Sequence, residues 1–208
     1  MNPNASRALY VAVEGPIGVG KTTLVQGLKK RLQARLVLEV VEENPFLARF
    51  YEDRDRYAFQ TQLFFLMSRF RQQQELLQAD LFSPSTLADY HLLKDRIFAR
   101  LTLRDDELML YERVYTSLET QILQPDVLIY LNARHDVLLS RIRKRDRPFE
   151  RDFDGDYLAS LSDAYRHHFA HYAGRVPLLA LDTSDIDYVT SEEPIDRIYD
   201  EVLRLAGR

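Results

Sequence analysis

Residues 8–24, ALYVAVEGPIGVGKTTL, place a short apolar run directly before a glycine-rich turn and the start of a helical pattern. Within this stretch GPIGVGKT, residues 15–22, matches the phosphate-binding pattern G-x-x-x-x-G-K-[ST] in full. Glycines allow the backbone to wrap closely around phosphate groups, the lysine neutralises their charge, and the hydroxyl suits Mg²⁺. A chance glycine turn is disfavoured, because the loop lies between a predicted strand and a predicted helix, which is the context that phosphate binding needs. We therefore predict that these residues bind the phosphates of a nucleoside triphosphate: Gly15, Pro16, Ile17, Gly18, Val19, Gly20, Lys21, Thr22 and Thr23.

Further apolar runs alternate with helical patterns along the rest of the chain. The runs are nearly continuous rather than alternating, as expected of strands that are covered on both faces of a sheet. The alternation of strand and helix predicts an α/β domain with about five parallel strands. The further strands are expected at 35–41, 85–90, 126–131 and 176–182. Helices are expected at about 53–79, 91–101, 105–122, 136–145, 155–173 and 193–206.

The composition narrows the class of protein. A chain of 208 residues without a convincing linker predicts one domain, 1–208, with residues 1–7 flexible. A net charge of −4 argues against a protein that coats nucleic acid, and the absence of cysteine excludes disulfides and thiolate metal sites. No apolar run approaches the roughly 20 residues that span a bilayer. We expect a cytoplasmic protein without a membrane partner.

Carboxylates follow two of the predicted strands, at the edge of the sheet where ligands of open α/β sheets bind. Glu39 lies near the end of the second strand and could accept a proton from an attacking hydroxyl group, although Glu42 and Glu43 compete for this role. Asp89 closes the third strand, where a phosphate-loop protein is expected to hold Mg²⁺. Alternatively, Asp89 is the N-cap of the helix that follows. His91 is expected to be a structural hydrogen-bonding group.

A basic run, RIRKRDRPFER at 141–151, holds six cationic side chains in eleven positions. Arg141 and Arg145 lie on one helical face, and Pro148 favours a helix end just before it. Arg145 and Arg147 then fall where a helix gives way to a loop, a position suited to bidentate phosphate contacts. A nucleic-acid contact surface would have no use for the carboxylate of Glu150.

Several ordered stretches beside the phosphate loop carry a resemblance to a known family. They are EVVEENPFLARFY (39–51), YAFQTQLFFLMSRF (57–70), ADYHLLKDRIFA (88–99) and RIRKRDRPFE (141–150). With them the chain, from about residue 8 to 182, resembles a deoxyribonucleoside kinase of the bacterial deoxyadenosine/deoxyguanosine kinase group. This resemblance implies a P-loop kinase fold with a lid at about 143–153, ATP and Mg²⁺ as cofactors, and a homodimer formed through the helices at 53–79 and 105–122.

The resemblance also implies roles for individual residues. Glu39 corresponds to the general base on the 5′-hydroxyl group, and Tyr51 and Glu150 to the pair that holds the 3′-hydroxyl, with the tyrosine crowding the 2′ position. Catalysis is expected to involve Lys21, Glu39, Arg145 and Arg147, and Arg141 is expected near the ATP base. The deoxynucleoside is expected to contact Glu39, Tyr51, Gln62, Arg69, Asp89, Asp95, Phe98 and Glu150, and Mg²⁺ to contact Thr22 and Asp89. Gln62 would read the base edge, and Arg69 and Asp95 would form a pair beside the base.

One departure from the family pattern concerns charge near the 5′-oxygen. Many relatives carry an Arg-Ser pair after the strand-ending acid, where this chain has Tyr90 and His91. Lys94 or a lid arginine could supply the missing charge. The Asp-Tyr-His version resembles the deoxyguanosine kinase branch, so we expect a purine deoxyribonucleoside substrate, deoxyguanosine before deoxyadenosine. The alternatives are a nucleoside monophosphate kinase, or a phosphate-loop ATPase that binds nucleic acid or a protein partner.

Overall fold

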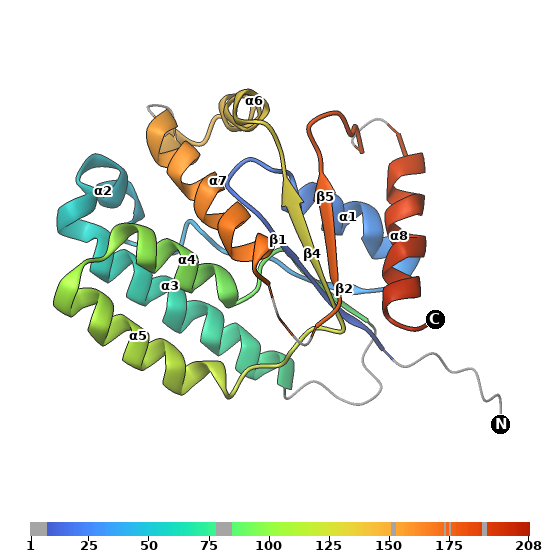
Figure 1. Cartoon of the computed structure of the whole chain (residues 1–208), viewed down its shortest axis with the longest axis horizontal. Helices are drawn as coiled ribbons and strands as arrows, with labels where there is room; N and C mark the ends of the chain where they lie inside the picture. The colour runs from blue at the N-terminus through green and yellow to red at the C-terminus, as the bar shows by residue number, and fades with distance from the viewer. Residues whose placement is uncertain (1–7, 78–84, 151–152, 173, 175, 189–190) are drawn as a thin grey trace.

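A five-stranded, wholly parallel sheet forms the centre of the molecule (Figure 1). The computed structural model describes residues 8–77, 85–150, 153–172, 174, 176–188 and 191–208. The strand order is β2-β3-β1-β4-β5, so the strand that precedes the phosphate loop lies in the middle. The strands are β1 (Tyr10–Glu14), β2 (Arg35–Val37), β3 (Thr86–Ala88), β4 (Val127–Asn132) and β5 (Leu178–Asp182).

Helices cover both faces of the sheet (Figure 1). Helices α1 and α8 lie against one face, whereas α3, α4 and α7 lie on the other, with α2 and α5 packed outside them. None of the helices in the described part of the chain combines the length and apolar character needed to cross a bilayer. The helices are α1 (Lys21–Leu32), α2 (Leu47–Glu52), α3 (Arg54–Leu77), α4 (Leu93–Thr102), α5 (Asp105–Glu119), α6 (His135–Arg145), α7 (Gly155–Ala170) and α8 (Glu193–Leu205), with a 3₁₀ turn, η1, at Pro148–Glu150.

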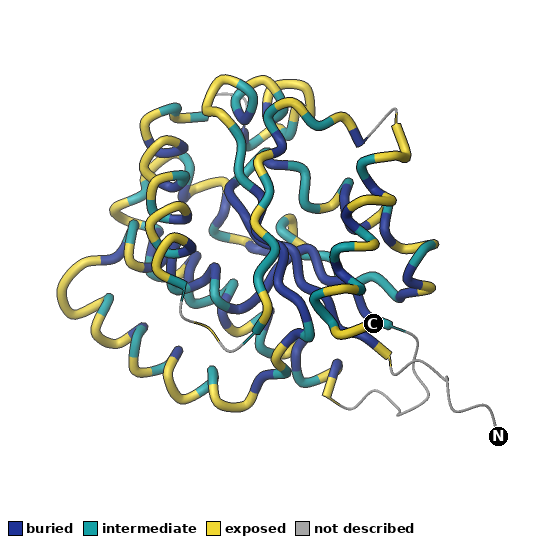
Figure 2. Tube along the Cα trace, turned by 45° about the vertical axis from the view of Figure 1, so that its right-hand side comes forward, coloured by how far each residue is buried: buried dark blue, intermediate teal, exposed yellow. Residues whose placement is uncertain are grey.

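The central strands are buried along nearly their whole length (Figure 2). Their side chains alternate between two cores. Val11 and Val13 point into the core beneath α1 and α8, whereas Tyr10 and Ala12 point into the core beneath α7. A third core joins α2 to α5. Because β1 is buried on both sides, the loop that follows it starts from a rigid base.

The predicted α/β architecture is confirmed, with differences at the sheet edges. The second strand ends at Val37 rather than at residue 41, and the third covers 86–88 rather than 85–90. The edge strands β2 and β5 are only partly buried, so the expectation of strands covered on both faces was wrong for them. Helix α2 was not predicted, because its six residues are too few for a periodic pattern. The expected flexibility of residues 1–7 lies outside the described residues.

Candidate active site

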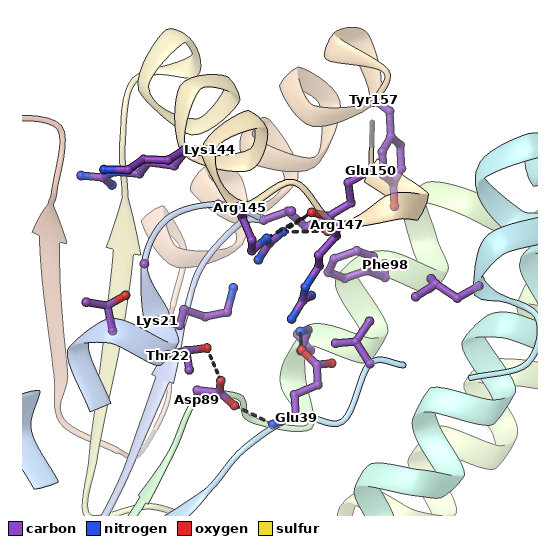
Figure 3. A pocket seen from close by; sticks show the side chains of 18 of the residues that line it. Lys21, Thr22, Glu39, Asp89, Phe98, Lys144, Arg145, Arg147, Glu150 and Tyr157 are labelled. Atoms are coloured by element: carbon purple, nitrogen blue, oxygen red, sulfur yellow. Dashed lines mark hydrogen bonds and ion pairs between the residues drawn. The ribbon is translucent and has the colours of Figure 1, made fainter. Parts of the chain in front are cut away.

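A cavity of about 850 Å³ opens at the carboxyl ends of the strands (Figure 3). The phosphate loop and the start of α1 line one end of it, and α2, α3 and α4 line the other. The end of α6 and the segment that follows it lie across the top and direct Arg145 and Arg147 toward the space between the two ends. Ligands bind at this edge in open α/β sheets, so the cavity is where the fold predicts a site.

The phosphate loop adopts conformations that require glycine at two of its positions. A Cβ atom on Gly15 would lie 2.3 Å from the carbonyl oxygen of Leu131, and Gly18 has φ +81°. A Cβ atom on Gly18 would meet the Leu138 carbonyl oxygen at 2.9 Å. The close approach to β4 and α6 leaves the loop wrapped around the N-terminus of α1, whose positive end attracts anions.

Lys21, Thr22 and Asp89 lie together beneath the loop (Figure 3). The Lys21 ammonium group donates to the carbonyl oxygens of Gly15 (2.7 Å) and Pro16 (3.0 Å), and burial together with the nearby Lys94 lowers its pKa to about 8. The Thr22 hydroxyl donates to Asp89 Oδ2 at 2.5 Å. Asp89 is therefore oriented toward the hydroxyl group that the sequence assigns to Mg²⁺.

The other carboxylate oxygen of Asp89 holds the backbone of the predicted base in place. Asp89 Oδ1 accepts from the Glu39 backbone N–H at 2.8 Å. Glu39 lies two residues beyond β2 and lines the cavity, whereas Glu42 and Glu43 are exposed loop residues. Of the three carboxylates that competed for the role of base, the structure places Glu39 in the cavity.

Two buried cations hold the Glu39 carboxylate. Arg69 donates to its Oε1 from Nε, at 3.1 Å, and from Nη2, and Lys94 donates to its Oε2 at 2.8 Å. Burial alone would raise the pKa of Glu39, but Arg69 and Lys94 hold it far below its ordinary value. Glu39 is thus fully ionised and held in one orientation.

The base-reading residues predicted from the sequence separate into two layers. Gln62, Arg69 and Phe98 line the cavity. Asp95 is fully buried and is absent from the lining; it lies behind Arg69 and accepts a hydrogen bond from Arg69 Nη1. Burial raises the pKa of Asp95 to about 7 despite the attraction of Arg69 and Lys94. A direct contact between Asp95 and a base stays a prediction, and in this structure Asp95 orients Arg69.

The residues predicted at the sugar lie on α2 and η1. The Tyr51 ring stacks on Phe149, with centroids 5.8 Å apart, and packs against Phe153. Glu150 is buried and receives a bidentate contact from Arg145, with Nη2 2.7 Å from each carboxylate oxygen. The predicted sugar ligand and the predicted phosphate ligand are therefore paired with each other (Figure 3).

Two further arginines of the basic run, Arg141 and Arg147, have separate partners. Arg147 Nη2 lies 3.2 Å from Glu42. Arg141 donates to the carbonyl oxygens of Val19 (3.2 Å) and Thr183 (2.8 Å), so it ties the phosphate loop to the segment after β5. Its contact with an ATP base stays a prediction. The expected lid, 143–153, includes residues 151–152, which lie outside the described residues.

Sequence reasoning missed one buried carboxylate at the site. Glu14, the last residue of β1, is fully buried and accepts from the backbone N–H groups of His91 (2.5 Å) and Gly15 (3.1 Å) and from the Tyr165 hydroxyl (3.1 Å). Burial raises its pKa. The only sequence feature that could have pointed to Glu14 is an acidic residue at the end of an apolar strand. Glu14 joins the phosphate loop to the segment that carries Asp89.

His91 has the structural role expected of it. Its Nδ1 accepts from the Leu93 backbone N–H at 3.2 Å, and burial lowers its pKa to about 4. A neutral, buried imidazole that caps the turn before α4 is positioned for structure rather than for hydroxyl activation.

The residues around Thr22 fit a magnesium ion that arrives with a triphosphate. Mg²⁺ prefers oxygen ligands and commonly takes one or two carboxylates together with phosphate oxygens and water. Thr22 and Asp89 offer a hydroxyl and a carboxylate at hydrogen-bond distance beside Lys21. Within the described residues no group of three or more His, Cys, Asp or Glu side chains could hold a metal by itself.

Fold and site together define a phosphate-loop phosphotransferase with a carboxylate facing its acceptor site. The sequence profile of the deoxynucleoside kinase family matches residues 11–206, and the chain belongs to this family. It is 35% identical to a deoxyguanosine kinase of Bacillus subtilis, over 95% of this chain and 98% of that protein. It is 32% identical to a deoxyadenosine/deoxycytidine kinase of the same species, over 92% and 90%.

A solved structure extends the similarity to three dimensions. The deoxyadenosine kinase of M. mycoides with bound dCTP superposes with a TM-score of 0.80 at 25% identity, over 93% of this chain and all of that one. The same kinase with bound dATP gives 0.81 at 25% identity, over 92% and 99%. The P-loop kinase fold and the deoxynucleoside kinase class predicted from the sequence are confirmed: the protein is an enzyme that phosphorylates deoxynucleosides with a nucleoside triphosphate.

Proposed function

We propose that this enzyme transfers the γ-phosphoryl group of ATP, with Mg²⁺, to the 5′-hydroxyl of a purine deoxyribonucleoside, with deoxyguanosine preferred to deoxyadenosine. The observation that carries the proposal is the position of Glu39. Its carboxylate lies in one cavity with the phosphate loop on one side and with Gln62 and Arg69 on the other. A neutral hydroxyl acceptor needs such a proton acceptor, whereas a nucleoside monophosphate would be repelled by it.

In the proposed reaction the 5′-O–H bond breaks and its proton passes to Glu39 as the oxygen attacks the γ-phosphorus in line. The bond between that phosphorus and the bridging oxygen breaks, and its electron pair leaves on ADP. Lys21 and the lid arginines Arg145 and Arg147 stabilise the charge on the transferred group. Mg²⁺, held by Thr22 and Asp89, would neutralise charge on the β- and γ-phosphates.

Base preference is supported by chemistry at the far end of the cavity. The Gln62 amide offers one donor arm and one acceptor arm, which suits bidentate reading of a base edge. Arg69 contributes donors only, and these favour acceptors such as the O6 and N7 atoms of guanine. Similarity to a deoxyguanosine kinase at 35% identity points the same way.

A panel of the four deoxynucleosides, each incubated with ATP and Mg²⁺ and analysed by chromatography of the products, tests the proposal. We expect deoxyguanosine 5′-monophosphate to form with the highest kcat/KM and deoxyadenosine 5′-monophosphate next. Parallel reactions with the monophosphates as acceptors test the alternative enzyme class. A diphosphate product from those reactions, without phosphorylation of nucleosides, would contradict the proposal.

We also propose that the enzyme is a homodimer that pairs through α3 and α5. In the described part of the chain, four of the five exposed large hydrophobic side chains lie on these helices: Met67, Leu77, Met109 and Leu110. Light scattering after size exclusion tests this, with a mass of twice 24.4 kDa expected. A monomer at micromolar concentration would contradict it.

A further inference from the structure

We infer that Lys94 is a catalytic residue, whose ammonium group leaves Glu39 when the deoxynucleoside binds and then lies against the attacking 5′-oxygen. The inference rests on the proposed function and adds a residue to it. Lys94 lies in the first turn of α4, is 5% exposed and lines the cavity. Its side chain holds the carboxylate that is assigned the role of base.

The basicity of Glu39 depends on the cations that contact its carboxylate. Two cations stabilise its ionised form, Arg69 at Oε1 and Lys94 at Oε2. A carboxylate held in this way accepts a proton poorly, because both ion pairs favour the charged form. A 5′-hydroxyl must also approach a carboxylate oxygen to about 2.6–3.2 Å. The carboxylate becomes a better proton acceptor when one of the two cations moves away from it.

Arg69 is the cation that is held in place. Its guanidinium also contacts Asp95 and lies 4.6 Å from the centroid of the Phe65 ring. Moving it would leave the fully buried Asp95 without its cation, which is costly in a low-dielectric interior. Arg69 therefore stays with Glu39 and keeps the carboxylate oriented.

Lys94 is the cation that can move. Its ammonium group makes one side-chain hydrogen bond within the described residues, 2.8 Å to Glu39 Oε2, and lies 5.6 Å from the centroid of the Phe98 ring. An ammonium has three donors on a flexible four-carbon stem, so it can exchange one acceptor for another. A small rotation of this stem frees Oε2 and leaves the charge in the same part of the cavity.

Lys94 lines the same cavity as Lys21 and the phosphate loop. After burial, Lys94 is the largest influence that lowers the pKa of Lys21, so the two ammonium groups lie near enough to repel each other. Lys94 also acts on Glu14, and it opposes the rise that burial causes in the pKa of that carboxyl group. The 5′-oxygen has to lie between Glu39 and the phosphate loop, and Glu39, Lys21 and Lys94 all line the cavity that holds this space.

The chemical step then balances without a further reactant. The 5′-proton passes to Glu39, the new O–P bond forms, and the electron pair of the broken bond leaves on ADP. Lys94 keeps its protons throughout. Its positive charge stabilises the oxygen as the proton leaves, a form of electrostatic catalysis that acts mainly in the transition state.

The test compares Lys94→Met with the wild type and with Lys30→Met, which removes an exposed charge on α1. Lys94→Gln serves as a second, polar replacement in case the methionine variant does not fold. The readouts are kcat with the preferred deoxynucleoside, its KM, and the Kd of the matching 2′,5′-dideoxyribonucleoside, which lacks the attacking hydroxyl. Circular dichroism melting reports the fold of each variant.

We expect the Lys94 variants to lose about 10²-fold or more in kcat. Their affinity for the 2′,5′-dideoxyribonucleoside should stay within threefold of the wild type, and Lys30→Met should match the wild type throughout. A kcat within threefold of the wild type would overturn the catalytic role. A loss of analogue affinity that parallels the loss of kcat would show instead that Lys94 is structural. Wild-type protein that phosphorylates no deoxynucleoside would overturn the proposed function, and this inference with it.

Discussion

Replacing Arg69 with methionine tests how strongly the two buried carboxylates depend on one guanidinium. The Arg69 side chain is 6% exposed, and its partners Asp95 and Glu39 are 0% and 13% exposed. Methionine fills similar space but leaves Asp95 without a cation and Glu39 with Lys94 alone. Breaking a buried pair costs about 3–5 kcal/mol, so Arg69→Met should lower the free energy of unfolding by about that amount at pH 8.5.

The loss of unfolding free energy in Arg69→Met should grow as the pH rises. An acid whose pKa is raised in the folded state contributes stability that is present below its unfolded value and lost as pH rises through the folded value. For Asp95 these values are 3.8 and about 7 in the wild type, and without Arg69 the folded value rises further. Glu39 also loses Arg69, so the two stabilities differ increasingly across the acid range in which Glu39 titrates. Above that range they should run in parallel up to about pH 7, and the gap between them should widen above pH 7.

Urea unfolding followed by circular dichroism at pH 6 and pH 8.5 measures both effects. A loss of 3–5 kcal/mol corresponds to a fall in the midpoint on the order of 1–2 M urea. Arg71→Met is the matched control, because Arg71 is exposed on the same helix and its removal should change stability by less than about 0.5 kcal/mol. A loss below 1 kcal/mol for Arg69→Met at pH 8.5, or a gap that is equal at the two pH values, would refute the reasoning.

Two further predictions concern the phosphate loop and the sugar. Gly18→Ala places a Cβ atom 2.8 Å from Ile142 in a residue with φ +81°. The variant should lose about 1–3 kcal/mol of unfolding free energy and bind ATP more weakly in calorimetry. Gly207→Ala is the control, because Gly207 has φ +76° and no atom within 4 Å, so this change should show the backbone strain alone. Unchanged ATP affinity in Gly18→Ala would argue against this close packing. Tyr51→Ala should bring the kcat/KM values of ribonucleoside and deoxyribonucleoside about tenfold closer, because it removes the ring that is proposed to crowd the 2′ position. Tyr51→Phe keeps the ring and should keep the discrimination; equal effects of the two changes would show that crowding is not the cause.

The fold could be predicted from the sequence wherever a local pattern decides it. The run before Gly15, the loop and the first turns of α1 were predicted because strand, turn and helix signals follow one another without ambiguity. The end of β2 could not be predicted, because residues 38–41 are as apolar as the strand itself. The chain leaves the sheet there because the Glu39 backbone N–H bonds to Asp89 rather than to a neighbouring strand.

The site was predictable as a set of residues but not as an arrangement. Glu39, Gln62 and Arg69 could be singled out by motif, and the structure brings them into one cavity. That Arg69 and Lys94 both hold Glu39 depends on contacts 30 and 55 residues apart in the chain, which no local pattern encodes. Asp95 was expected beside the base, as the partner of Arg69, through the resemblance to the family, and only its complete burial reveals that it lies behind Arg69.

The central claim is that Glu39 takes the proton from the 5′-hydroxyl group. Its most direct test is the single-turnover rate of Glu39→Gln with ATP, Mg²⁺ and the preferred deoxynucleoside, beside Glu42→Gln as the matched loop control. We expect Glu39→Gln to lose about 10²–10⁴-fold in rate while Glu42→Gln stays within a few-fold of the wild type. Near-normal turnover in Glu39→Gln, with the loss in Glu42→Gln instead, would contradict the claim.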